Sequence, residues 1–282
     1  MFERSTLSVL AVGLSVLASA TPTYLVLGDS LAFGYILGDV TPSPGLQGYA
    51  DDVLGAVNAK TGVSHDFLNL AVPQETSVSF GNTDVGIARG LNMNYLAGVL
   101  GGTPVSQLSM MQTSVAAIKG AGNTVDYASF AIGANDLLGL TNGGSTIPTQ
   151  GEIDAVFASA LNRYVSVLDY LKGEFPTVHL LRPSYYNPLS TSTLLGAALD
   201  PQVENFNTSL KTLAASYGAT YIDFYTPIDG NQLSLITPGD IHPNAAGYAV
   251  LGQVAAQAVP EPATLCAVAL GAAALLRRRR AG

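Results

Sequence analysis

Short apolar runs alternate along this chain with longer stretches in which apolar residues recur every three or four positions. The short runs have the length and β-rich character of strands, and the longer stretches have the period of helices. The expected strands are 24–27, 67–72, 127–132, 178–181 and 220–224. This alternation favours a single α/β domain, with a parallel sheet covered by helices on both faces.

Three helices are best supported by their periodicity and caps. Apolar residues keep one face from 152 to 171, and Thr149 with Glu152 forms a capping box at the start. Asp200 followed by Pro201 predicts the start of a second helix, because aspartate caps helices and proline suits the first helical position. A third helix is expected at 245–258, and Gly/Asn/Thr-rich loops at 38–48, 81–104 and 139–149.

The first twenty residues have the pattern of a secretory signal peptide. Arg4 lies near the start, an apolar stretch follows at 7–17, and Ala18-Ser19-Ala20 resembles a cleavage site. The alternative is a buried N-terminal helix, after which the first strand would begin abruptly behind Pro22. We therefore expect a signal peptide at 1–20 and a folded domain at 21–258.

The other end, 259–282, also has the character of a targeting segment. Pro260-Glu261-Pro262 precedes an uncharged run at 263–276 and four arginines at 277–280. As a helix this run is about 21 Å long, short of the roughly 30 Å hydrocarbon core of a membrane. The arginines favour the cytoplasmic side, which leaves the large domain outside.

This C-terminal arrangement resembles the PEP-CTERM sorting signal. The resemblance implies recognition and cleavage by an exosortase in a Gram-negative bacterium, with transient membrane association through the apolar helix. The mature protein would then end near Pro260 and reside in the cell envelope, on the cell surface or in the extracellular matrix. An uncleaved transmembrane tail anchor is the alternative.

Charge and cysteine content exclude several classes of protein. The formal net charge is −8, with 12 basic and 20 acidic residues, which argues against nucleic acid as a partner. The only cysteine, Cys266, lies in the apolar tail, so no disulfide framework or thiolate metal cluster is expected. His65 and His179 have no companions at ligand spacing. No metal or cofactor is implied.

Candidate chemistry begins where the first strand ends. The apolar run 24–27 stops at Gly28, and Ser30 follows at the edge of the sheet where ligands bind in open α/β folds. A serine needs a general base to act as a nucleophile. His242 lies near the far end of the domain, just before the last expected helix, with Asp240 beside it. Ser30 and His242 can meet only through the fold.

Three blocks in this order resemble those of the SGNH (GDSL-type) hydrolases. They are Gly28-Asp29-Ser30-Leu31, Gly133-Ala134-Asn135-Asp136 and Asp240-Ile241-His242-Pro243-Asn244. The resemblance implies a flavodoxin-like three-layer α/β/α domain with a parallel sheet of about five strands. It also implies ester hydrolysis through an acyl-enzyme, with Ser30 as nucleophile and oxyanion donor, Asn135 as a second donor and His242 as base. The Gly-x-Ser-x-Gly elbow of the common α/β-hydrolases is absent.

The chain departs from this family pattern at two positions. The segment 69–76 resembles a further block of the family, and Gln74 stands where that block has its oxyanion glycine. A backbone N–H remains, but a side chain disfavours positive φ. Gly239 stands where the family has its triad aspartate. Asp240 would complete the triad if the loop were one residue tighter; otherwise the site is a Ser–His dyad in which a backbone carbonyl orients the histidine. Asp223, at the end of the last expected strand, is interpreted as structural and is the reserve candidate for a displaced triad acid.

Two functions from different classes remain open. The first is hydrolysis of a carboxylic ester, with polysaccharide O-acetyl groups suggested by the PEP-CTERM setting and with lipid esters and thioesters as other substrates. The second, motivated by Gln74 and Gly239, is a catalytically weakened cell-surface protein that binds matrix polysaccharide. Tyr185-Tyr186-Asn187 would either stack on and bind sugar or pack internally.

Overall fold

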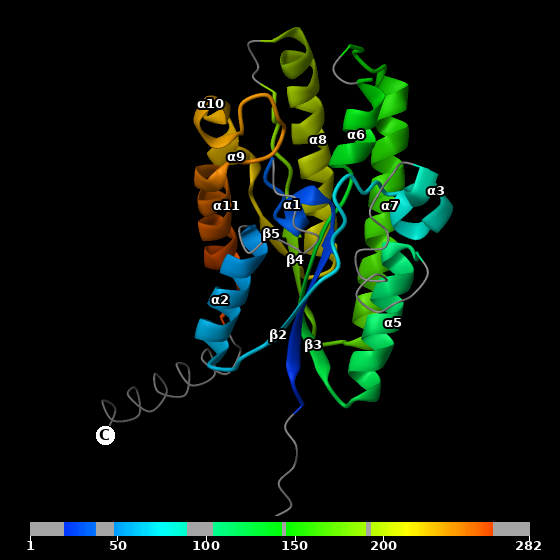
Figure 1. Ribbon diagram of the computed structural model, residues 1–282, viewed down its shortest axis with the longest axis vertical. Helices are drawn as coiled ribbons and strands as arrows, with labels where there is room; N and C mark the ends of the chain where they lie inside the picture. Colours follow the sequence, from blue (N-terminus) through cyan, green and yellow to red (C-terminus); the bar gives the residue numbers. More distant parts are fainter. Residues whose placement is uncertain (1–19, 38–47, 89–103, 143–144, 190–192, 262–282) are drawn as a thin grey trace, which may run out of the picture.

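A computed structural model describes residues 20–37, 48–88, 104–142, 145–189 and 193–261 (Figure 1). The expected signal peptide up to residue 19 and the apolar tail at 263–276 lie outside these ranges, so both stay predictions. No helix within the described ranges is long and apolar enough to cross a membrane.

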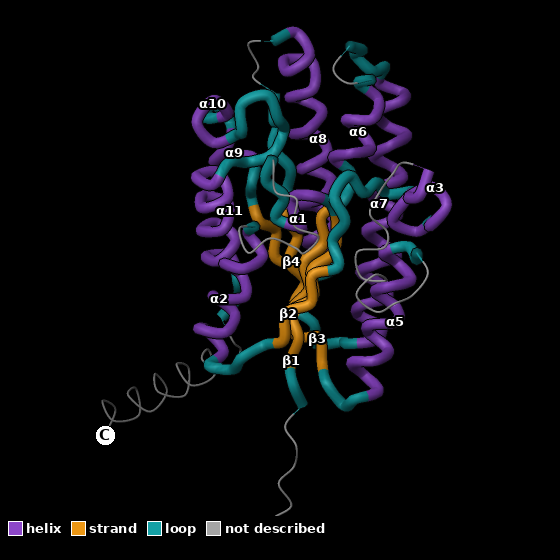
Figure 2. Tube along the Cα trace, in the orientation of Figure 1, coloured by secondary structure: helices purple, strands orange, loops and turns teal. Residues whose placement is uncertain are grey.

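Five parallel strands form one sheet, in the order β2-β1-β3-β4-β5. This confirms the predicted α/β fold, and the order is that of flavodoxin-like proteins, in which ligands bind at the switch point between β1 and β3. The strands are β1 (Pro22–Gly28), β2 (Asp66–Asn69), β3 (Thr124–Ala131), β4 (His179–Pro183) and β5 (Thr220–Ile222). The sheet runs through the centre of the molecule (Figure 2).

The second strand is shorter than its apolar run predicted. β2 ends at Asn69, although the N–H groups of Leu70 and Val72 still donate to the carbonyl oxygens of Val26 and Gly28 in β1. The prediction of a strand to residue 72 was therefore wrong at its end, because the chain turns away at Pro73 and Gln74.

Helices cover both faces of the sheet (Figure 1). The helices α2 (Tyr49–Thr61) and α11 (Ala245–Ala258) pack together on one face, and α5 (Gln107–Gly120), α7 (Gln150–Glu174) and α8 (Leu194–Ser216) cover the other. Shorter helical segments are α1 (Ser30–Phe33), the 3-10 turn η1 (Ser79–Gly81), α3 (Thr83–Ala88), α6 (Ala134–Leu140), α9 (Tyr225–Ile228) and α10 (Gln232–Leu235). The segment 81–104, expected to be a loop, thus includes α3.

The caps explain one success and one failure of the helix predictions. The capping box of Thr149 and Glu152 is present at the start of α7, as predicted. The prediction that a helix opens at Asp200 is wrong, because Thr193 caps α8 earlier by accepting a bond from the Gly196 N–H. Pro201 consequently lies inside the helix, and Asp200 accepts hydrogen bonds from the side chains of Asn187 and Tyr225 instead of capping.

Candidate active site

Segments that follow two neighbouring strands, together with the loop before the last helix, form the site. Ser30 is the first residue of α1, directly after β1, and Asn135 is the second residue of α6, after β3. His242 lies in the loop that precedes α11. The site therefore occupies the switch point of the sheet, where β1 and β3 are adjacent.

The residues before and after Ser30 are fixed by buried contacts. The Asp29 carboxylate accepts hydrogen bonds from the Leu31 N–H at 3.1 Å and from the Tyr185 hydroxyl at 2.8 Å. Burial raises the pKa of Asp29 to about 6. Asp29 thus braces the loop that carries Ser30.

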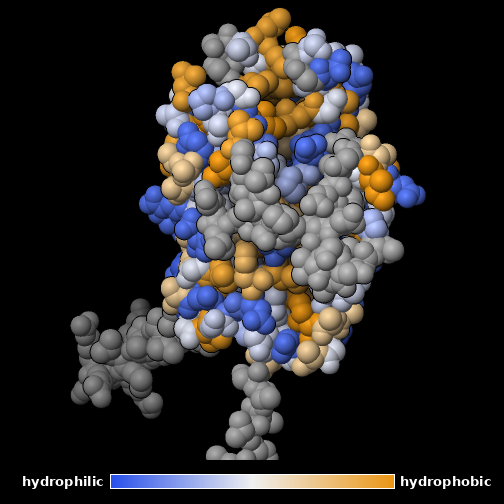
Figure 3. Space-filling model, viewed as in Figure 1, coloured by the Kyte–Doolittle hydropathy of each residue, from blue (hydrophilic) through white to orange (hydrophobic). Residues whose placement is uncertain are grey.

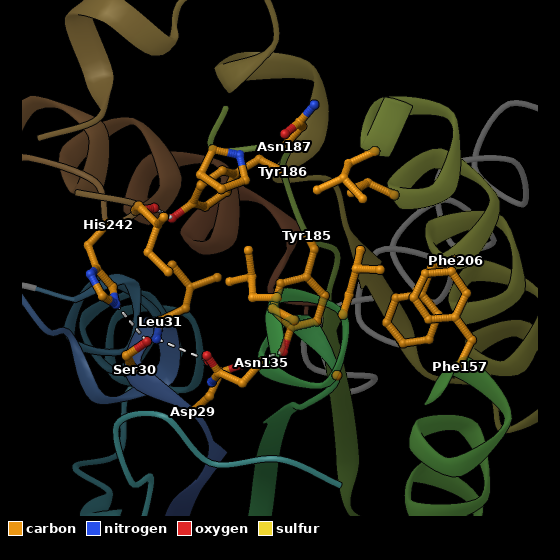
Figure 4. A pocket seen from close by; sticks show the side chains of 18 residues that line it. Asp29, Ser30, Leu31, Asn135, Phe157, Tyr185, Tyr186, Asn187, Phe206 and His242 are labelled. Carbon is orange, nitrogen blue, oxygen red and sulfur yellow. Dashed lines mark hydrogen bonds between the residues drawn. The ribbon is translucent and has the colours of Figure 1, made fainter. Parts of the chain in front are cut away.

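Ser30, His242 and Asp240 form a continuous chain of hydrogen bonds, of which Figure 4 draws the bond between Ser30 and His242. The Ser30 Oγ lies 2.8 Å from His242 Nε2, and His242 Nδ1 lies 2.9 Å from Asp240 Oδ2. A carboxylate can only accept, so His242 Nδ1–H donates to Asp240 and Nε2 accepts from the Ser30 hydroxyl. The ring of Tyr35 packs against the imidazole, with centroids 4.6 Å apart.

The loop around Asp240 is tight enough to place this acid two residues before the histidine. The Thr237 N–H donates to the His242 carbonyl, and the Asp240 N–H donates back to the Thr237 carbonyl. Gly239 adopts a φ of +79°, a left-handed conformation that suits glycine. Asp240 therefore reaches the imidazole from a position where the family pattern has no acid.

Asp223, the reserve acid, has a different role. Its carboxylate accepts hydrogen bonds from the backbone N–H groups of Tyr225 and Thr226 and from the Thr226 hydroxyl. These bonds stabilise the first turn of α9, so Asp223 is a local structural residue.

Gln74 occupies the left-handed conformation that its side chain disfavours. Its φ is +66°, and the Glu75 N–H donates to the Val72 carbonyl across the turn at 3.1 Å. Proline at the second position and positive φ at the third are typical of a type II turn, which explains how Pro73 helps Gln74 into this geometry. The backbone thus keeps the shape for which the family uses glycine.

Asn135 is tied to the same turn. Its side-chain nitrogen donates to the Glu75 carbonyl oxygen at 3.0 Å, and an amide nitrogen carries a second N–H. The predicted oxyanion donors Gln74 and Asn135 therefore belong to two segments that are hydrogen-bonded to each other.

Gln107, at the start of α5, is a residue of the site that the sequence analysis missed. Its side chain accepts from the Gly28 N–H at 2.6 Å and donates to the Gly28 carbonyl at 2.9 Å. It also donates to the buried carboxylate of Glu75 at 3.2 Å. Gln107 thereby joins the end of β1 to the turn that holds Gln74, and no local pattern at residue 107 signals this long-range contact.

A pocket that is partly open to solvent extends from Ser30 and His242 (Figure 4). Its walls are mostly apolar, and apolar residues surround the hollow between the ends of α6, α8 and α10 in the space-filling view (Figure 3). Tyr185, Tyr186 and Asn187 line it but are almost fully buried. Internal packing, one of the two roles considered for these three residues, is therefore observed, and contact with sugar stays a prediction.

The two other histidines lie elsewhere. His65 is buried, and its Nδ1 lies 3.0 Å from the Asn58 side-chain oxygen. The ring of His179 stacks on that of Tyr127, with centroids 4.9 Å apart. Within the described ranges, no three His, Cys, Asp or Glu side chains are grouped as metal ligands.

Solved structures share this fold at low sequence identity. The lipase Lip_vut3 from a goat rumen metagenome is 16% identical, with a TM-score of 0.60 over 85% of this chain and 98% of that one. Axe2, an acetylxylan esterase from Geobacillus stearothermophilus, is 15% identical, with a TM-score of 0.52 over 85% and 94%. A GDSL-like lipase from Parabacteroides merdae is 12% identical, with a TM-score of 0.51 over 85% and 95%. A sequence search of curated proteins finds no significant match.

Two family profiles match the sequence. Residues 258–280 match the PEP-CTERM protein-sorting motif, which indicates export through the exosortase system of Gram-negative bacteria. Residues 26–250 match the GDSL-like lipase/acylhydrolase family and include Ser30, Asn135 and His242. The protein is therefore an exported member of the GDSL-like lipase/acylhydrolase family.

Proposed function

We propose that this protein hydrolyses carboxylic esters through an acyl-enzyme formed on Ser30. The observation that carries the proposal is the chain of hydrogen bonds from Ser30 Oγ through His242 to Asp240, at 2.8 and 2.9 Å. This chain of hydrogen bonds lies at the wall of a mostly apolar pocket that is partly open to solvent. Nucleophile, base and orienting acid are thus within hydrogen-bonding distance of one another.

Each half of the reaction uses the same proton carrier. Ser30 Oγ attacks the carbonyl carbon while its proton passes to His242 Nε2, and His242 then protonates the departing alcohol oxygen. In the second half, a water molecule gives a proton to His242 and attacks the acyl-enzyme. The proton returns to Ser30 Oγ as the carboxylic acid leaves. Asp240 stabilises the imidazolium and fixes its tautomer.

The oxyanion is assigned to three donors. These are the backbone N–H groups of Ser30 and Gln74 and the side-chain amide of Asn135. The bond between Asn135 and Glu75 supports this assignment, because it holds the amide at the turn that carries Gln74. Each such donor typically contributes about 10²–10³ in rate.

In this proposal, the two ends of the chain are export signals that are removed from the mature protein. The proposal includes removal of residues 1–20 by a signal peptidase and exosortase cleavage near Pro260, after transient membrane association through 263–276. The sorting motif supports a location on the cell surface or in the extracellular matrix.

The first test is serine-dependent ester hydrolysis. The full chain and its Ser30→Ala variant are assayed with p-nitrophenyl esters and labelled with a fluorophosphonate. Turnover and labelling of the wild type, both lost in a folded Ser30→Ala variant, support the proposal. Equal turnover by the variant would refute it. Glycan binding without turnover or labelling would favour the alternative of a polysaccharide-binding protein.

A further inference from the structure

The pocket beside Ser30 has a composition that selects among esters. Its side walls are aliphatic: Leu31, Leu137, Leu138, Leu199, Val203 and Ile241. The far end is formed by Phe157 from α7 and Phe206 from α8, whose rings stack with centroids 4.3 Å apart at an interplanar angle of 14°. Such a surface gains free energy from apolar groups and offers little to a sugar.

The polar side chains beyond the proposed catalytic groups are already bonded within the protein. The Tyr185 hydroxyl donates to Asp29, and the Tyr186 hydroxyl donates to the Ile241 carbonyl. The Asn187 amide donates to the Gly196 carbonyl. The Tyr185 and Tyr186 hydroxyls have each used their one donor proton, so a carbohydrate in this pocket could only donate to them, whereas a hydrocarbon chain needs no hydrogen bond.

The direction of the pocket identifies the part of the ester that it takes. The departing alcohol oxygen must lie beside His242 Nε2, since that atom protonates it. Phe157 and Phe206 lie at the opposite end of the row of lining side chains from His242, beyond Asn135 (Figure 4). The group that extends from the carbonyl carbon toward these rings is therefore the acyl chain.

We propose that the pocket binds an unbranched apolar acyl chain of medium length, and that the stacked pair Phe157 and Phe206 limits that length. The inference rests on the proposed esterase function and names its substrate class: esters of medium-chain fatty acids, in preference to acetyl groups on polysaccharide. Phe206 is held in place on one side by Gly133, where an added Cβ would lie 2.8 Å from the ring.

The test is the dependence of kcat/KM on acyl length. For the full chain with p-nitrophenyl acetate, butanoate, hexanoate, octanoate and decanoate, each methylene that enters the pocket should raise kcat/KM by up to about fourfold. The increase should stop when the chain reaches the stacked rings. A wild type that prefers acetate would overturn the inference and leave the esterase proposal standing.

Two variants test the role of the far end. Phe157→Ala should move the optimum toward longer chains, and Leu138→Phe should lower the ratio of octanoate to acetate turnover by at least about tenfold. Phe67→Ala is the matched control, because Phe67 is also partly buried but lies in β2 and does not line the pocket. If Phe157→Ala and Phe67→Ala had the same acyl profile as the wild type, the assignment of the far end would be wrong.

A binding measurement separates this inference from catalysis. The Ser30→Ala variant is titrated calorimetrically with octanoate and with acetate. Octanoate should bind with a negative heat-capacity change, as expected when apolar surface is buried, and acetate should not. If the variant binds octanoate but the wild type has no esterase activity, the assignment of the pocket to an acyl chain stands and the proposed function is rejected. No binding of octanoate would overturn the pocket assignment.

Discussion

Asp240 takes the role that the family pattern gives to an aspartate at the position of Gly239. The family position three residues before the histidine is occupied by Gly239, yet both carboxylate oxygens of Asp240 lie within 3.0 Å of His242 Nδ1. The turn closed by the Thr237 and Asp240 backbone bonds shortens the path from acid to histidine. An aspartate two residues before the histidine can therefore orient the imidazole as well as one three residues before it.

The contribution of Asp240 is tested by Asp240→Asn, with Asp223→Asn as its matched control. An asparagine can donate to His242 Nδ1, which moves the imidazole proton to Nε2 and prevents Nε2 from accepting the Ser30 proton. We expect kcat to fall by roughly 10²–10⁴-fold for Asp240→Asn and to stay unchanged for Asp223→Asn. Steady-state kinetics measure both. An equal loss in the two variants would contradict the triad.

Asp29 makes the stability of the protein depend on pH. Burial raises its pKa from 3.8 to about 6 in the folded state. Below about pH 3 the carboxyl is protonated in both states. As the pH rises toward 6, the unfolded chain releases this proton and the folded chain retains it, so the folded state loses relative stability.

The Asp29→Asn variant isolates this effect. Between about pH 4 and pH 7, the free energy of unfolding of the wild type should fall by up to about 3 kcal/mol relative to the variant. Asp51, whose pKa burial also raises to about 6, is present in both proteins and cancels. Urea unfolding at several pH values measures the difference. A difference that stays constant over this range would show that Asp29 does not titrate as described.

At the scale of elements, the turn from Val72 to Glu75 joins three parts of the site. It is bonded to the end of β1 through the Val72 N–H and Gly28 carbonyl, and to α6 through Asn135. The side chain of Gln107 in α5 forms hydrogen bonds with both Gly28 and Glu75. The conformation of Gln74 is therefore determined by three surrounding elements, which offset its unfavourable φ.

Substitutions at Gln74 test whether the surrounding contacts offset its unfavourable φ. Gln74→Gly should retain activity and gain up to about 1 kcal/mol of stability, because glycine adopts positive φ without steric cost. Gln74→Val should lower kcat by at least about tenfold, since a β-branched residue resists this conformation and displaces the backbone N–H. Kinetics and thermal unfolding of the folded variants measure both effects. Full activity of Gln74→Val would show that the N–H is not an oxyanion donor.

At the scale of the whole molecule, the site and the ends of the packed domain lie at opposite edges of the sheet (Figure 1). The start of β1 and the end of α11 are close to the amino edge, whereas α1 and the loop before α11 lie toward the carboxyl edge. Val259, just past α11, is only 2% exposed, and its carbonyl accepts from Lys60 of α2. The packed domain thus continues one residue beyond the expected boundary at 258.

Chains that start at residue 21 and end at 258 or 261 test this boundary. Loss of the buried Val259 side chain should cost the shorter chain about 1.5–3 kcal/mol of unfolding free energy. Lys60→Ala in the longer chain removes its hydrogen bond to the Val259 carbonyl and its ion pair with Glu261, and should cost less because both contacts are partly exposed. Denaturant unfolding compares the three proteins. Equal stability of the two chain lengths would place the boundary before Val259.

The sequence was sufficient for features that depend on local pattern. The strands of the sheet, the capping box of α7 and the serine, asparagine and histidine blocks follow from apolar periodicity and short motifs, which act over a few residues. It failed where two local signals competed, as at the start of α8, where the Thr193 cap precedes the Asp200-Pro201 pair.

Long-range contacts were decided only by the tertiary structure. These are the approach of His242 to Ser30 across 212 positions, the contact of Gln107 with Gly28 across 79, and the stack of Phe157 on Phe206. The choice between Asp240 and Asp223 as the partner of His242 also required the folded loop. The physical reason is that such contacts depend on how separate elements pack together, whereas strands, caps and turns are favoured by residues that are neighbours in the chain.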